Sequence, residues 1–96
     1  MPKFDVDVPH NLPLPDVRTR LARAKGKLES AYGAQCTWEG EDRLIVTRKG
    51  LHATVNVEPS RLHIDVELGL LLTPMAGAIR NGITRQLTEL LEERAS

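Results

Sequence analysis

Residues 51–68 read LHATVNVEPSRLHIDVEL, two runs in which apolar and polar residues alternate on either side of a Pro-Ser pair. Alternation with a period of two is typical of strands buried on one face, and proline with serine favours a turn between them. A hairpin with its tip at residues 59–60 sets four apolar pairs opposite one another: Val57 with Leu62, Val55 with Ile64, Ala53 with Val66, and Leu51 with Leu68. One face of this hairpin is wholly apolar, which predicts an antiparallel sheet covered on that side.

The alternation continues upstream of the hairpin. A tip at residues 49–50 adds a third strand through two further pairs: Val46 with Ala53, and Leu44 with Val55. A three-residue connection at residues 40–42 then brings Trp38 and Cys36 to the apolar face, whereas a two-residue connection turns Trp38 outward. Residues 3–8 alternate in the same way and predict a strand at an edge of the sheet, whose pairing partner stays open.

Residues 15–32 predict an amphipathic helix. Pro15 and Asp16 suit its first turn, where a fixed φ and a negative charge are favourable, and Gly33 suits its end. The apolar positions recur every three or four residues: Leu14, Val17, Leu21, Ala24, Leu28 and either Ala31 or Tyr32.

A second helix is predicted from Thr73, as the N-cap, and Pro74, in the first turn, to about residue 93. Glycine weakens a helix interior by roughly 1 kcal/mol relative to alanine, so Gly77 and Gly82 predict close packing against the sheet or a second chain. Its apolar stripe consists of Met75, Ala76, Ile79, Ile83, Leu87, Leu90 and Leu91.

Both helical stripes need an apolar sheet face to cover them. We therefore predict an α+β fold in the order β-α-β-β-β-β-α, an antiparallel sheet with two helices packed on one face, as a single domain over residues 1–96. The single cysteine, Cys36, excludes an intramolecular disulfide and fits a reducing compartment. With no apolar stretch near the N-terminus and none long enough for a membrane span, we expect a cytoplasmic protein.

Thirteen basic and thirteen acidic residues cancel, so no general electrostatic attraction to nucleic acid is expected. The first predicted helix is nevertheless basic, without aromatic residues that would stack on bases. The basic residues of this helix are Arg18, Arg20, Arg23, Lys25 and Lys27.

The hairpin register also gathers polar residues on the outer sheet face, in the pairs His52 with Glu67, Thr54 with Asp65, and Asn56 with His63. Two histidines and two carboxylates can bind a metal or exchange protons, but polar residues are also what an alternating strand exposes to water. We predict His10 to be a loop or capping residue and Cys36 a buried apolar one. The sequence therefore predicts no metal, no cofactor and no enzyme activity.

Residues 68–72, LGLLL, join the last strand to the second helix. Sheet and helix change direction there, so these leucines cannot all point into the core; either some are exposed and form a docking surface, or they seal the end of the core. Leu70, Leu71 and Leu72 are the primary candidates for surface binding. Arg18, Arg20 and Arg23 are secondary candidates.

The chain resembles the polyhydroxyalkanoic acid system proteins, small bacterial proteins encoded near polyhydroxyalkanoate genes. The likeness covers nearly the whole sequence. It lies in Met1-Pro2-Lys3 leading to Pro9-His10, Tyr32-Gly33, Trp38-Glu39-Gly40, Lys49-Gly50, and Val66-Glu67-Leu68-Gly69-Leu70-Leu71-Leu72 followed by Gly77, Ile79, Ile83 and Leu87.

The resemblance implies a role in polyhydroxyalkanoate metabolism or at its storage granules, in the bacterial cytoplasm, with a granule or granule protein as partner. It implies no reaction and no catalytic residue. We expect a non-enzymatic accessory protein that binds granules or another hydrophobic surface. The alternatives are a small module that carries an acyl ligand between sheet and helices, and a structural homo-oligomer.

Overall fold

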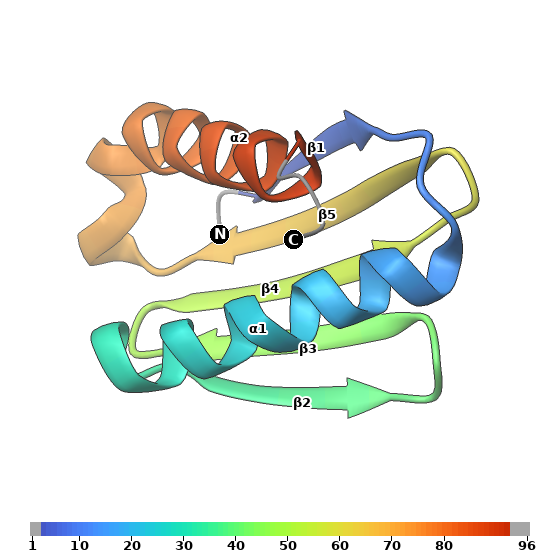
Figure 1. Cartoon of the computed structure of the whole chain (residues 1–96). Coiled ribbons are helices and arrows are strands. Elements are labelled where there is room, and N and C mark those ends of the chain that lie inside the picture. Colours follow the sequence, from blue (N-terminus) through green and yellow to red (C-terminus); the bar gives the residue numbers. More distant parts are fainter. Residues whose placement is uncertain (1–2, 93–96) are drawn as a thin grey trace.

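The computed structural model describes residues 3–92 as a five-stranded antiparallel sheet with two helices on one of its faces (Figure 1). The elements are β1 (Lys3–Pro9), α1 (Leu14–Tyr32), β2 (Gln35–Glu39), β3 (Arg43–Arg48), β4 (Leu51–Val57), β5 (Arg61–Leu68), the 3-10 helix η1 (Leu70–Met75) and α2 (Ala76–Glu92). The predicted fold class and element order are confirmed. Met1 and Pro2 of the resemblance, and the predicted helix end at residue 93, lie outside the described residues.

The strands pair in the order β1-β5-β4-β3-β2. Val55 lies opposite Ile64 in β5 and opposite Leu44 in β3, as the alternation predicts. Trp38 lies opposite Leu44, so the three-residue connection is the one that forms. The sequence left the pairing partner of β1 open. In the structure, β1 pairs antiparallel with β5 and sets Val6 opposite Ile64. β5 is therefore an interior strand, and β1 and β2 form the two edges.

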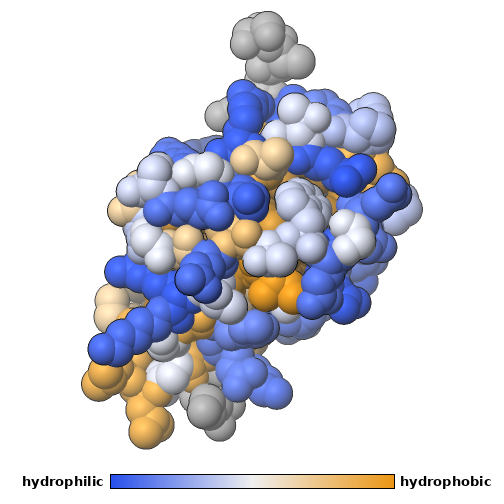
Figure 2. All heavy atoms as spheres, turned by 90° about the horizontal axis from the view of Figure 1, so that it is seen from below, coloured by the Kyte–Doolittle hydropathy of each residue, from blue (hydrophilic) through white to orange (hydrophobic). Residues whose placement is uncertain are grey.

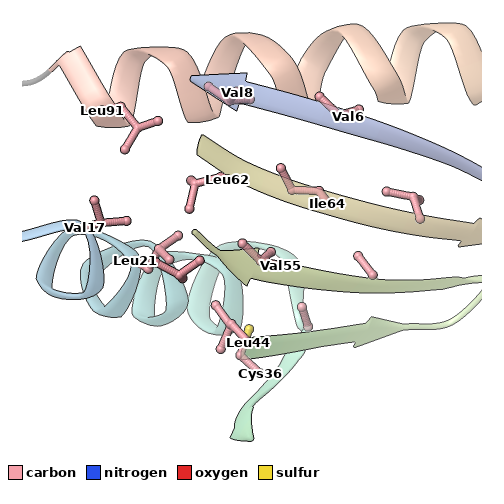
Figure 3. Packing of buried hydrophobic residues seen from close by; sticks show 14 of the residues in the cluster. Val6, Val8, Val17, Leu21, Cys36, Leu44, Val55, Leu62, Ile64 and Leu91 are labelled. Carbon is pink, nitrogen blue, oxygen red and sulfur yellow. The ribbon is translucent and has the colours of Figure 1, made fainter. Parts of the chain in front are cut away.

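Side chains from the sheet and both helices meet in one core (Figure 3). α2 lies over β1, and α1 lies over β2 and β4. Val17 of α1 and Leu91 of α2 point toward Leu62 of β5, whose side chain has no exposed surface. Burying a leucine of this kind contributes roughly 1.5–3 kcal/mol, so this junction fixes both helices to the sheet.

The predicted bounds of α1 agree with the structure. Gly33 ends the helix with φ +67°, a left-handed conformation that glycine adopts without strain, and the N–H of Ala34 donates to the Leu28 carbonyl at 3.3 Å. The predicted apolar stripe is wrong at both ends, because Leu14 is exposed at its start and Ala31 and Tyr32 are exposed at its end. The sheet no longer lies beneath the last turn of the helix.

The start of the second helix differs from the prediction. The Thr73 hydroxyl donates to the Gly69 carbonyl at 3.1 Å instead of accepting a bond as an N-cap, and Pro74 lies inside η1. Met75, predicted to be in the core stripe, is 52% exposed. The predicted close packing of the sheet on Gly77 and Gly82 is also wrong, because no described atom outside the helix's own backbone lies within 4 Å of a Cβ added at either position. Packing of a second chain on these glycines stays a prediction.

One buried charge connects the helices. Arg20 is only 3% exposed, and its Nη1 donates to the Leu90 carbonyl of α2 at 2.7 Å. Its Nε donates to Asp16 Oδ1, one turn earlier in α1, at 3.3 Å. The guanidinium thus links α1 to a backbone carbonyl of α2.

Candidate functional site

The most exposed large apolar side chains gather at η1. Leu70 is 85% exposed, Leu71 is 88% exposed, and Met75 follows at 52%. We call these three residues the apolar tip. Figure 2, seen from the β2 edge, shows hydrophobic side chains projecting at the end of the molecule where η1 lies, beside hydrophilic ones. The tip therefore has the exposure that a docking surface requires.

The apolar tip is held in place by its neighbours in the turn. The N–H of Gly69 donates to the Gly50 carbonyl at 2.8 Å, which ties η1 to the β3–β4 turn. Leu72 packs against the core and covers Gly50, where an added Cβ would lie 3.3 Å from Leu72 Cδ1. The backbone of the two preceding leucines is thereby fixed with their side chains outward, so little backbone entropy remains to be lost when they contact a surface.

The six candidate residues thus separate into exposed and inward-facing groups. Leu72 is partly buried and anchors the tip rather than projecting from it. Arg18 and Arg23 are exposed on α1, and the Arg18 guanidinium lies 5.7 Å from the centre of the Trp38 ring. Arg20 leaves the candidate surface, because a side chain buried between the two helices cannot contact a particle.

A second group of polar side chains meets on the sheet face opposite the helices. The imidazole of His63 has Nδ1 2.6 Å from Asp7 Oδ1 and Nε2 3.2 Å from Asp65 Oδ1 and 3.8 Å from Asp5 Oδ2. The hydrogen bond with Asp7 raises the pKa of His63 above its ordinary value of 6.5. The same bond, helped by the charge of Arg61, lowers the pKa of Asp7 below 3.8.

The sequence identified His63 and Asp65 on this face, and the structure adds Asp5 and Asp7 from β1. No local sequence pattern predicts the contact between these β1 and β5 side chains, because more than fifty residues separate the two strands. Only the outward alternation of the two aspartates in β1 shows that they would line a polar face.

His10 and Cys36 are structural in this fold. The N–H of Leu12 donates to His10 Nδ1 at 3.2 Å, which leaves the proton on Nε2 to donate to the Glu58 carbonyl at 2.9 Å. His10 thus ties the β1–α1 loop to the β4–β5 turn. Burial raises the pKa of the Cys36 thiol, which disfavours the reactive thiolate.

Two shallow hollows are open to solvent at the surface of the described residues. One lies on the outer sheet face, lined by Lys3, His52, Thr54, Asp65, Val66 and Glu67. The other lies at the start of α1, lined by Leu14, Pro15, Arg18, Glu41, Asp42 and Val57. Neither is an enclosed chamber of the kind that an acyl carrier would need.

Comparison with models of known families gives a match over most of the chain. The model of a family described as "Putative polyhydroxyalkanoic acid system protein" matches residues 4–91. Neither the curated proteins nor the solved structures contain a match. Among residues 3–92, neither helix has the length and apolar character to cross a membrane.

Proposed function

Since the chain belongs to the polyhydroxyalkanoic acid system protein family, we propose that it is a non-enzymatic accessory protein that binds the hydrophobic surface of polyhydroxyalkanoate storage granules through its apolar tip. The proposed role needs an apolar surface that binds the polyester, and it needs no catalytic group. It places the chain in the cytoplasm, at the granule boundary.

One observation carries this proposal. Leu70 and Leu71 are adjacent, almost fully exposed, and fixed outward by the inward packing of Leu72. Burying one leucine side chain against an apolar phase gains roughly 1.5–3 kcal/mol, so the pair supplies about 3–6 kcal/mol before the costs of association. That energy suits reversible attachment to a particle.

The exposed bases of α1 give a secondary contact. Arg18 and Arg23 lie on a helix that also carries Lys25 and Lys27. Exposed charges separated by more than about 8 Å are largely screened at physiological ionic strength, whereas apolar contacts persist or strengthen in salt. Binding through the tip should therefore survive 0.5 M salt, while the α1 contribution should fade.

The test is co-sedimentation of the purified chain with polyhydroxyalkanoate particles. Leu71→Asp removes one leucine contact, so the dissociation constant should rise about 10- to 100-fold, since tenfold corresponds to 1.4 kcal/mol. Its melting temperature should hardly change, because the side chain is 88% exposed.

Leu14→Asp is the matched control. Leu14 is 40% exposed at the start of α1, at the opposite end of the molecule from η1 (Figure 1), and a carboxylate is favourable in the first turn of a helix. In 0.5 M salt, where the contribution of the nearby Arg18 has faded, this variant should bind particles like the parent chain. Equal affinity of the parent chain and Leu71→Asp for the particles would contradict binding through the tip.

A homo-oligomer would use the same tip differently. If the tip pairs with a second copy, Leu71→Asp should reduce the sedimentation coefficient measured without particles. A monomeric parent chain that binds particles, together with a Leu71→Asp variant that does not, would favour the granule surface as the partner.

A further inference from the structure

The outer face of β1 and β5 carries a side-chain cluster that the proposed granule contact does not use. Pairing of the two strands sets Asp5 opposite Asp65 and Asp7 opposite His63. All four side chains point away from the helices. The side chains of Asp5 and Asp65 are more than half exposed, whereas His63 is partly buried, with 23% of its side chain exposed.

Three of these groups offer ligand atoms at metal-binding separations. His63 Nε2 lies 3.2 Å from Asp65 Oδ1 and 3.8 Å from Asp5 Oδ2, and all three ligand atoms lie within 4.8 Å of one another. Bonds of about 2.0–2.2 Å in tetrahedral zinc sites place ligand atoms roughly 3.3–3.6 Å apart. Small side-chain rotations are enough to reach that geometry.

Asp7 stands outside this ligand set and orients it. Its carboxylate lies 2.6 Å from His63 Nδ1 and accepts the Nδ1 proton, while Nε2 lies 3.2 Å from Asp65 Oδ1. A metal ion would displace the proton from Nε2, because the Asp7 bond keeps the other proton on Nδ1. Metal-binding histidines almost always have such a carboxylate or carbonyl on their second nitrogen.

Neighbouring cations do not neutralise the two carboxylates. The Arg61 guanidinium pairs with Asp7 at 3.3 Å and with Glu58 at 3.2 Å. Within residues 3–92, no lysine or arginine forms an ion pair with Asp5 or Asp65. Two negative charges and a nitrogen lone pair therefore converge on one point, and a divalent cation there would offset their repulsion.

We propose that Asp5, His63 and Asp65 bind one divalent transition-metal ion of the zinc class, with water completing its coordination and Asp7 as the positioning residue. One imidazole with two carboxylates suits Zn²⁺, whereas Ca²⁺ and Mg²⁺ prefer all-oxygen sites. The ion would link edge strand β1 to interior strand β5. The sequence predicted no metal because it paired His63 only with residues of its own hairpin.

The first test is calorimetric titration of the metal-free 96-residue chain with Zn²⁺ at pH 7.5, which should give one site per chain. His63→Gln and Asp65→Asn should each weaken binding at least 10-fold, and Asp7→Asn should weaken it about 10- to 100-fold as an orienting residue. His52→Gln is the matched control on the same face and should leave binding unchanged. Absence of binding, or equal loss in the control, would overturn the site.

The second test needs no substitution, so it holds even if a variant fails to fold. Co²⁺ added below stoichiometry should broaden the ring resonances of His63 in the parent chain first. His10 has both ring nitrogens engaged in hydrogen bonds, and His52 belongs to no described cluster of this kind. Broadening of either of these before His63 would contradict the proposal.

Discussion

Arg20→Met tests whether the buried guanidinium holds the two helices together. Methionine keeps much of the apolar stem and removes the two polar contacts, to the Leu90 carbonyl at 2.7 Å and to Asp16 at 3.3 Å. A hydrogen bond from a charged group contributes about 1.5–3 kcal/mol, and an i,i+4 pair with a partly exposed partner about 0.3–0.5 kcal/mol. The free energy of unfolding should therefore fall by about 2–3.5 kcal/mol.

The assay is urea unfolding at pH 7, followed by circular dichroism and by the fluorescence of Trp38, whose transitions should coincide for a two-state chain. The midpoint should fall while the slope with urea stays the same. A loss of this size lowers the melting temperature by about 8–28 °C in a chain of this length.

Arg18→Met is the control, because Arg18 is exposed and its guanidinium lies 5.7 Å from the centre of the Trp38 ring. A cation–π contact at an exposed site contributes about 0.5–1 kcal/mol. If Arg20→Met costs no more than this control, then Arg20 is not the link between α1 and α2.

In buffer with a chelator, His63→Gln should be less stable than the parent chain, with the largest difference between pH 3.8 and 6.5. The raised pKa of His63 stabilises the parent fold fully below pH 6.5, and the lowered pKa of Asp7 stabilises it fully above pH 3.8. The difference should fade as pH rises through the raised pKa; a constant difference to pH 9 would contradict the ion pair. Cys36 should react with iodoacetamide at pH 8 far more slowly than free cysteine, since burial raises its pKa, and reaction at the free rate would contradict its burial. Gly50→Ala should cost more than Gly33→Ala in thermal unfolding, because both have positive φ but only the former has a side chain within 4 Å of the new Cβ, and equal costs would exclude that clash.

The sheet could be predicted because its order follows from local patterns. Each turn between β2 and β5 is short, so alternation on both sides of residues 59–60 and 49–50 fixes which residues face one another. The partner of β1 could not be predicted in this way, since the long α1 crossover allows either edge. The Asp5–His63 contact depends on that pairing and was therefore missed.

The start of α2 could not be predicted for a different reason. Thr73-Pro74 has the chemistry of a helix start, but the Thr73 hydroxyl instead closes a turn with Gly69, because the chain must first bend away from β5. The exposure of Met75 follows from that bend. Arg20 was predicted on the solvated face of α1, and only the position of α2 buries it.

Imaging tests most directly whether the apolar tip attaches this chain to granules. The 96-residue chain, fused to a fluorescent protein in cells that accumulate polyhydroxyalkanoate, should concentrate at the granule boundary, as should Leu14→Asp. The double variant Leu70→Asp, Leu71→Asp should spread through the cytoplasm at equal expression. A double variant that stays on the granules as strongly as the parent chain would contradict attachment through the apolar tip.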